Sequence, residues 1–168
     1  MITDAQIYCL DSNVLIQAWQ KYYSPKICPT YWEVLNSLGV QHRLFIPAVV
    51  KEEIMRTDDD LSKWIKTCKI PVLKINESVG QCLRQIYAAN PRHQFLADNT
   101  KQRSLADPWV IAFAMSEDAC VVTKEEKITA INTEKLKIPN VCENMHVRCI
   151  NDFEFGLELN LRFTCEII

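Results

Sequence analysis

The chain has 168 residues, of which 48% are hydrophobic and 24% charged, and this composition is typical of a soluble globular protein and excludes a disordered one. Its three glycines, Gly39, Gly80 and Gly156, lie too far apart to form a dinucleotide-binding or phosphate-binding glycine loop. The formal net charge of −2 argues against a protein that coats nucleic acid non-specifically, although it permits an enzyme with a local basic rim. We expect residues 1–168 to form a single domain.

Neither a membrane segment nor an export signal is expected. The longest apolar stretches, residues 45–50 and 108–115, are too short to cross a bilayer. The chain begins Met-Ile-Thr-Asp, without a basic or apolar targeting region. The eight cysteines are scattered and form no C-x-x-C pair, so they are predicted to be buried free thiols in a reducing compartment. We therefore expect a cytoplasmic protein that makes no contact with a membrane.

Short β-prone runs alternate with helical patterns along the chain. Strands are predicted at residues 7–10, 44–46, 72–75, 120–123 and 146–150. Helices are predicted at residues 13–20, 30–38, 49–56, 61–68, 77–90 and 105–117, with another short helix after Asp152. The alternation predicts an α/β fold: a three-layer α/β/α sandwich with a mostly parallel central sheet of about five strands. Ligands of such sheets bind beyond the carboxyl ends of the strands, so the candidate site is expected there.

Acidic residues occur in unexpected places near these strand ends. Asp11 ends the first strand, where it could face the cleft or cap the helix that begins near Asn13. In the helix predicted at residues 49–56, successive side chains are rotated by about 100°, which places Glu53 within the apolar stripe and Glu52 outside it. A carboxylate on a buried face is costly unless it is paired, hydrogen-bonded or bound to a metal. The alternative is that Glu53 lies at the edge of the stripe, in water.

Asp107 repeats the anomaly, because it shares a helix face with Val110 and Ile111. It also precedes Pro108, so it could be an N-cap, or the capping-box partner of Ser104. Taken together, the three acids come from separate segments and could converge on one cleft. Carboxylates that repel one another are usually brought together to hold a hard divalent cation.

These residues resemble the motifs of the PIN-domain ribonucleases. The opening run YCLDSNVLI (8–16) resembles the first strand and acid, and PAVVKEEI (47–54) resembles the second acidic motif, with Glu53 as the acid. LADPWVIA (105–112) resembles the third motif, and VVTKE (121–125) the fourth, with Glu125 in the place of the usual Asp. Residues 146–155 resemble the terminal strand and helix. Residues 22–39 and the tail after Gly156 are longer than in compact members such as the VapC toxins, which suggests a divergent branch.

The resemblance implies a Mg²⁺- or Mn²⁺-dependent endoribonuclease that hydrolyses RNA phosphodiester bonds. Asp11, Glu53 and Asp107 would hold the metal, and Glu125 would bind a second ion or orient a water. Two polar residues, Asn13 and Thr123, would support the acids or contact the phosphate. Basic residues that flank the acids would contact the RNA backbone: Arg56, Lys51, Arg103 and Lys124. Each of these could equally be a solvated surface charge.

The resemblance also implies partners. VapC-like toxins commonly form homodimers and are held inactive by a small antitoxin, so both partners are expected here. Five aromatic residues could supply such an interface or could pack on the chain's own core: Trp19, Tyr22, Tyr23, Tyr31 and Trp32. The alternative function is a PIN-like binding or scaffold protein without catalysis. A scaffold of this kind would be expected to lack one of the three acids Asp11, Glu53 and Asp107, and all three are present.

Overall fold

The computed structural model describes residues 5–97, 105–130 and 135–168. These residues form five strands: β1 (Tyr8–Leu10), β2 (Leu44–Pro47), β3 (Val72–Leu73), β4 (Cys120–Val122) and β5 (Cys149–Ile150). One 3₁₀ helix, η1, spans Pro91–Leu96, and the α-helices are α1 (Ser12–Gln20), α2 (Pro29–Val40), α3 (Ala48–Ile54), α4 (Asp60–Thr67), α5 (Glu77–Ala89), α6 (Asp107–Ser116), α7 (Ile138–Asn144) and α8 (Asp152–Glu158).

The strands form one parallel sheet in the order β3-β2-β1-β4-β5. The chain therefore starts in the middle strand, builds outward to β3, and then crosses to the other side of β1. The central register pairs Cys9 with both Phe45 and Val121. Because all five strands run the same way, their carboxyl ends meet at one edge of the sheet. Asp11 and Thr123 follow β1 and β4 at this edge.

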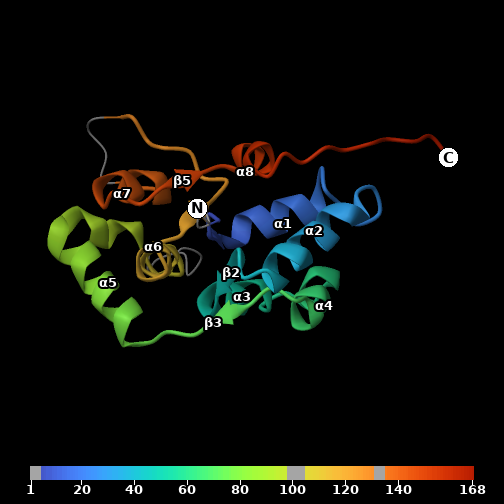
Figure 1. The fold of residues 1–168 in the computed structure, drawn as a ribbon. Coiled ribbons are helices and arrows are strands. Elements are labelled where there is room, and N and C mark those ends of the chain that lie inside the picture. The colour runs from blue at the N-terminus through green and yellow to red at the C-terminus, as the bar shows by residue number, and fades with distance from the viewer. Residues whose placement is uncertain (1–4, 98–104, 131–134) are drawn as a thin grey trace.

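Helices cover both faces of the sheet (Figure 1). In β1, the Cys9 thiol donates to the Val110 carbonyl of α6 at 3.8 Å, whereas the ring of its neighbour Tyr8 packs edge-on against Phe155 of α8 at 4.9 Å. Successive side chains of a strand point to opposite faces, so α6 and α8 lie on opposite sides of the sheet. The predicted three-layer α/β/α sandwich is thus confirmed, and its sheet is entirely parallel.

Two elements were not predicted, η1 and α7, and both are short. His93 of η1 is fully buried, with its Nδ1 2.6 Å from the Ile86 carbonyl of α5 and its Nε2 2.9 Å from Asn144 of α7. This histidine fastens η1 to both neighbouring helices. Tertiary contacts of this kind determine the structure of short segments and leave little periodic signal in the sequence.

The core is formed by the strands and the inward faces of the helices, and it contains Leu10, Leu15, Ile46, Ile111 and Phe113. All eight cysteines are free, but only Cys9, Cys120 and Cys142 are buried, and Cys165 is exposed. The expectation that the thiols are all buried was therefore wrong. Within the described ranges, no helix combines the length and apolar character needed to span a bilayer.

Candidate active site

Asp11 lies at the carboxyl end of the central strand and is 3% exposed. Its backbone continues the β1–β4 pairing, since its amide donates to the Val122 carbonyl at 3.0 Å. Its Oδ1 accepts from the Ser12 amide at 2.7 Å, and its Oδ2 accepts from Thr123 Oγ1 at 2.8 Å. Asp11 is thus the N-cap of α1 and also a buried carboxylate at the ligand-binding edge of the sheet, so the two interpretations of this residue are compatible.

Glu53 turns toward Asp11. Its Oε2 accepts from Ser12 Oγ at 3.0 Å, so Ser12 connects the two acids, with its amide bonded to one and its hydroxyl to the other. Glu53 is partly buried, whereas the adjacent Glu52 is exposed. The helical phase predicted from Val49, Val50 and Ile54 is therefore right for α3, and Glu53 does not simply lie in water. Ser12 itself was not predicted, although a hydroxyl directly after the first acid is a visible signal.

Asp107 is the first residue of α6 and is partly buried. The residue at the N-cap position is Ala106, and among the described residues no side chain forms a capping hydrogen bond to this helix. The N-cap interpretation of Asp107 was therefore wrong, and Ser104, its suggested capping-box partner, lies outside the described residues. With Pro108 in second position, the helix begins one residue earlier than an Asp N-cap would require. The charges of the other three acids nevertheless act on the Asp107 carboxyl group.

Glu125 lies in the loop after β4 and is fixed by α7. Its Oε2 accepts from the Ile138 amide at 2.8 Å, its Oε1 pairs with Lys137 Nζ at 3.3 Å, and its own amide donates to Thr123 Oγ1 at 3.1 Å. The unpredicted helix α7 therefore orients the fourth acid. Lys137 compensates part of its negative charge.

These four acids influence one another electrostatically. Burial, followed by the charges of Asp11, Glu125 and Glu53, raises the pKa of Asp107 to about 9 against the attraction of Lys137. Burial likewise raises the pKa of Asp11 to about 7, with Glu125 and Glu53 adding to the rise and the bonds from Thr123 and Ser12 opposing it. Burial also raises the pKa of Glu53, which Ser12 and Arg56 partly offset. A metal-free site of this kind retains a proton near neutral pH.

The donor set is that of a site for a hard cation, because all four groups are carboxylates and they arrive from four different segments. In the described part of the chain, however, no three acidic, histidine or cysteine side chains are already gathered around a single metal position. The acids are therefore close enough to raise one another's pKa without forming a preassembled cage. Two small clefts adjoin them: one of about 200 Å³ between Glu53 and the start of α6, and one of about 330 Å³ beside Glu125.

Polar contacts continue from the acids along the sheet edge. Asn13 donates to Thr123 Oγ1 at 3.3 Å and accepts from the Lys124 amide at 3.0 Å. Lys124 Nζ pairs with the buried Asp152 at 3.0 Å, and Tyr22 donates to the other oxygen of Asp152 at 3.1 Å. Asp152 was missed at the sequence level, although its place after the last strand matched the pattern used for Asp11.

The basic residues predicted to contact phosphate differ in their exposure and in their charged neighbours. Lys124 is bound to Asp152, so a phosphate would compete with that ion pair. Arg56 is exposed and attracts Glu53, and Lys51 is partly buried on α3. Arg103 lies outside the described residues. The role of these cations toward RNA stays a prediction.

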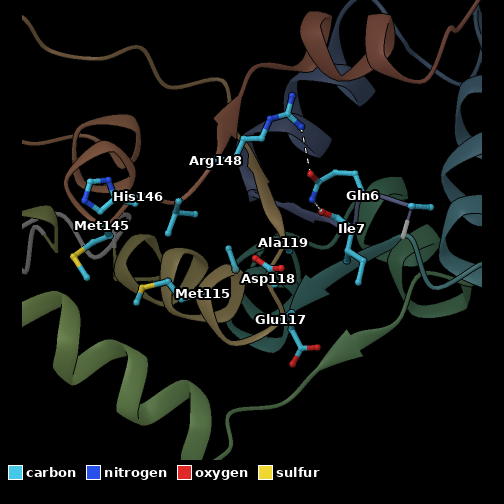
Figure 2. Close-up of a pocket in the computed structure, with 12 residues that line it drawn as sticks. Gln6, Ile7, Met115, Glu117, Asp118, Ala119, Met145, His146 and Arg148 are labelled. Carbon is cyan, nitrogen blue, oxygen red and sulfur yellow. Dashed lines mark hydrogen bonds between the residues drawn. The ribbon is translucent and has the colours of Figure 1, made fainter. Parts of the chain in front are cut away.

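A larger pocket, of about 670 Å³, lies at the opposite edge of the sheet (Figure 2). It is lined by residues that precede the strands, among them Gln6, Asp118, His146 and Arg148, and Figure 2 shows Arg148 reaching toward Gln6. Ligands of parallel α/β sheets bind at the carboxyl edge, so the size of this pocket does not make it the active site.

A family model described as "Domain of unknown function (DUF4411)" matches residues 8–163. The chain belongs to the DUF4411 family. A search of curated proteins finds no match to this DUF4411 chain.

Solved structures share its fold. VapBC2 from Rickettsia felis, bound to a DNA fragment from its promoter, matches with a TM-score of 0.56 and 13% identity, over 87% of this chain and 98% of that one. VapBC-1 from nontypeable Haemophilus influenzae matches with a TM-score of 0.53 and 15% identity, over 87% of this chain and 98% of that one. FitAcB from Neisseria gonorrhoeae matches with a TM-score of 0.55 and 13% identity, over 88% of this chain and 99% of that one. These matches confirm that the DUF4411 chain has the PIN-like fold predicted from its motifs.

Proposed function

We propose that this protein is a metal-dependent endoribonuclease that hydrolyses RNA phosphodiester bonds. The observation that carries the proposal is the mutual electrostatic effect of Asp11, Glu53, Asp107 and Glu125 at the carboxyl edge of the sheet. A protein that only needed to fold would gain nothing from acids that raise one another's pKa in a partly buried cleft. Such an arrangement is typical of a site that binds a cation.

Asp11, Glu53 and Asp107 would hold Mg²⁺ or Mn²⁺, which supplies positive charge beside the scissile phosphate and lowers the pKa of a bound water. Thr123 and Ser12 fix the two oxygens of Asp11, and Ser12 also bonds to Glu53, so these two acids are held near each other before a cation binds. Glu125, held by α7, would bind a second ion or orient a water. The RNA backbone would lie across the clefts that flank the acids.

The fold supports a more specific role. The matched structures named VapBC2, VapBC-1 and FitAcB share this fold, and the motifs resemble those of VapC toxins, so we propose that the chain is the toxin of a toxin–antitoxin pair, with an antitoxin and a second copy of itself as partners. Expression of the chain alone in a bacterial host should then arrest growth. Co-expression of the product of the adjacent reading frame should restore it.

The direct test of the nuclease activity is cleavage of total and synthetic RNA by the purified protein. Cleavage should require Mg²⁺ or Mn²⁺, should stop with EDTA, and should be absent in Asp107→Asn. A PIN-like scaffold without catalysis predicts no cleavage by either protein. Cleavage that persists in EDTA would contradict the proposal.

A further inference from the structure

Four aromatic side chains lie side by side next to Lys124. Tyr22 lies 5.8 Å from Phe153 and 5.0 Å from Tyr23, measured between ring centroids, and Tyr23 stacks on Phe163 at 5.2 Å with the ring planes 13° apart. They are contributed by the start of α8, the chain after α1, and the chain after α8, which lie together in Figure 1. These four residues are called the aromatic row below.

Three of the four rings are exposed, whereas Tyr23 is partly buried and stacks between Phe163 and Tyr31. Phe153 is 57% exposed, Phe163 48% and Tyr22 36%. Beneath Phe163 is a pocket of about 370 Å³, lined mainly by aromatic and aliphatic side chains, including Tyr31. The buried Tyr31 hydroxyl has no hydrogen-bond partner among the described residues. A contiguous exposed apolar surface of this kind marks a binding site more often than an isolated exposed residue does.

Three basic residues are neighbours of the aromatic row in sequence. Lys21 and Lys26 flank it in the chain after α1, and Arg162 precedes Phe163 and lines the same pocket. All three cations are exposed, and in the described ranges none forms an ion pair with a carboxylate. Beside Phe153, the buried Asp152 is paired with Lys124, whereas Glu154 is exposed and lines the cleft next to Phe153. Lys21, Lys26 and Arg162 therefore supply positive charges that suit the phosphates of a polyanion.

The aromatic row is also continuous with the acid site. Lys124 directly follows Thr123, which bonds to Asp11, and the Lys124 ammonium lies 4.9 Å from the Tyr22 ring and 4.8 Å from the Phe153 ring. Lys124 therefore links the residues around Asp11 to the rings of Phe153 and Tyr22.

We propose that the aromatic row is a stacking platform for the bases of a single-stranded RNA as the strand runs away from the acid site; the inference rests on the proposed nuclease function. Aromatic rings bind bases of any sequence through their π faces, and neighbouring cations bind the phosphates between them. Exposed rings, unpaired lysine and arginine side chains and continuity with the acids favour RNA over a protein partner here. A duplex keeps its bases stacked internally and would not use the row.

The test measures RNA binding by Asp11→Asn, which removes the complication of cleavage. The probes are a fluorescent single-stranded oligouridine of about ten nucleotides, within the range of single-strand sites, and an RNA hairpin of equal length. Phe153→Ala and Phe163→Ala in this background should each weaken single-strand binding about tenfold, a loss typical of one base stack, with little effect on the hairpin. Phe153→Tyr should bind like its parent. Phe95→Ala is the matched control, because Phe95 is 43% exposed on η1, outside the row.

The outcomes separate the two proposals. Wild-type cleavage with unchanged binding by the Phe153 and Phe163 variants would overturn the platform and leave the nuclease standing. Single-strand binding that depends on the row, without cleavage by the wild type, would support the platform and contradict the nuclease. If the two variants instead lose self-association by light scattering and keep RNA binding, the row is a protein interface and the inference is wrong. Thermal melts confirm folding, and Phe163 lies outside any helix or strand.

Discussion

Thr123 Oγ1 donates a 2.8 Å hydrogen bond to Asp11 Oδ2, which joins the residue after β4 to the residue after β1. The same oxygen accepts from Asn13 and from the Glu125 amide. One buried hydroxyl therefore positions the central acid and fixes the loop that carries the fourth acid. The bond also favours the ionised form of Asp11 and so opposes the rise in its pKa.

Thr123→Val should weaken the response to metal more than it weakens the fold. The change keeps the branched shape but removes the hydroxyl that donates to Asp11 Oδ2. Ionising Asp11 then becomes harder, so more Mn²⁺ is needed to occupy the site. We expect the Mn²⁺ concentration that gives half-maximal thermal stabilisation to rise roughly tenfold, the size of effect found for groups that orient metal ligands. Thr123→Ser should restore the wild-type value. An unchanged Mn²⁺ dependence in Thr123→Val would show that the bond does not position a ligand.

Glu52 and Glu53 offer a matched pair of substitutions in one helix. Glu53→Gln removes a charge from the group that Ser12 holds beside Asp11, so both cleavage and stabilisation by Mn²⁺ should fall strongly. Glu52→Gln makes the same chemical change on the exposed neighbour and should alter neither. Metal-dependent melts and RNA cleavage assays check both variants. Equal losses in the two variants would mean that general negative charge, rather than a defined ligand, matters.

The metal-free protein should lose stability as the pH rises. The pKa values of Asp11 and Asp107 are raised from 3.8 to about 7 and about 9, so the folded state retains protons that the unfolded state has released. The contribution of these groups is full below about pH 4 and is lost as the pH rises through 7 for Asp11 and 9 for Asp107. For Asp11 the loss has an upper bound of about 4 kcal/mol.

Denaturation in EDTA at a series of pH values measures this loss. Asp107→Asn should abolish the part of the decline between pH 7 and 9. Saturating Mn²⁺ should flatten the wild-type curve, because a cation favours the ionised carboxylates. A variant whose stability follows the same pH slope as the wild type would contradict the assignment of the higher pKa to Asp107.

The sheet and the phase of Glu53 could be predicted because both depend on local patterns. Strands such as residues 120–122 are buried on both faces and appear as uninterrupted β-prone runs, and a helix of even two turns shows its apolar stripe. Because acids follow the strands of a parallel sheet, they could then be predicted to lie at its carboxyl edge. These features need no knowledge of distant contacts.

The rest depends on contacts between segments far apart in sequence. His93 holds η1 in position through hydrogen bonds to residues seven and fifty-one positions away. Glu125 is oriented by the backbone amide of Ile138, the first residue of α7, whose second residue is Pro139. The aromatic prediction failed in part for the same reason. Tyr31 and Trp32 are buried, and Trp32 packs on Trp19 and Trp64, so these residues are not available as an interface.

Asp11→Asn separates a metal ligand from a simple helix cap. Asparagine caps helices nearly as well as aspartate, so a purely structural Asp11 predicts little change in stability and an intact response to Mn²⁺. As a ligand in a crowded acidic site, Asp11 predicts the opposite: the substitution removes repulsion, so the melting temperature in EDTA should rise, while stabilisation by Mn²⁺ and RNA cleavage should both disappear. In the wild type, Mn²⁺ at about a hundred times its dissociation constant should add about 3 kcal/mol, or several degrees. Thermal melts of both proteins in EDTA and in Mn²⁺ give the answer. A mutant that responds to Mn²⁺ like the wild type would show that Asp11 is not a ligand and would remove the main support for the nuclease.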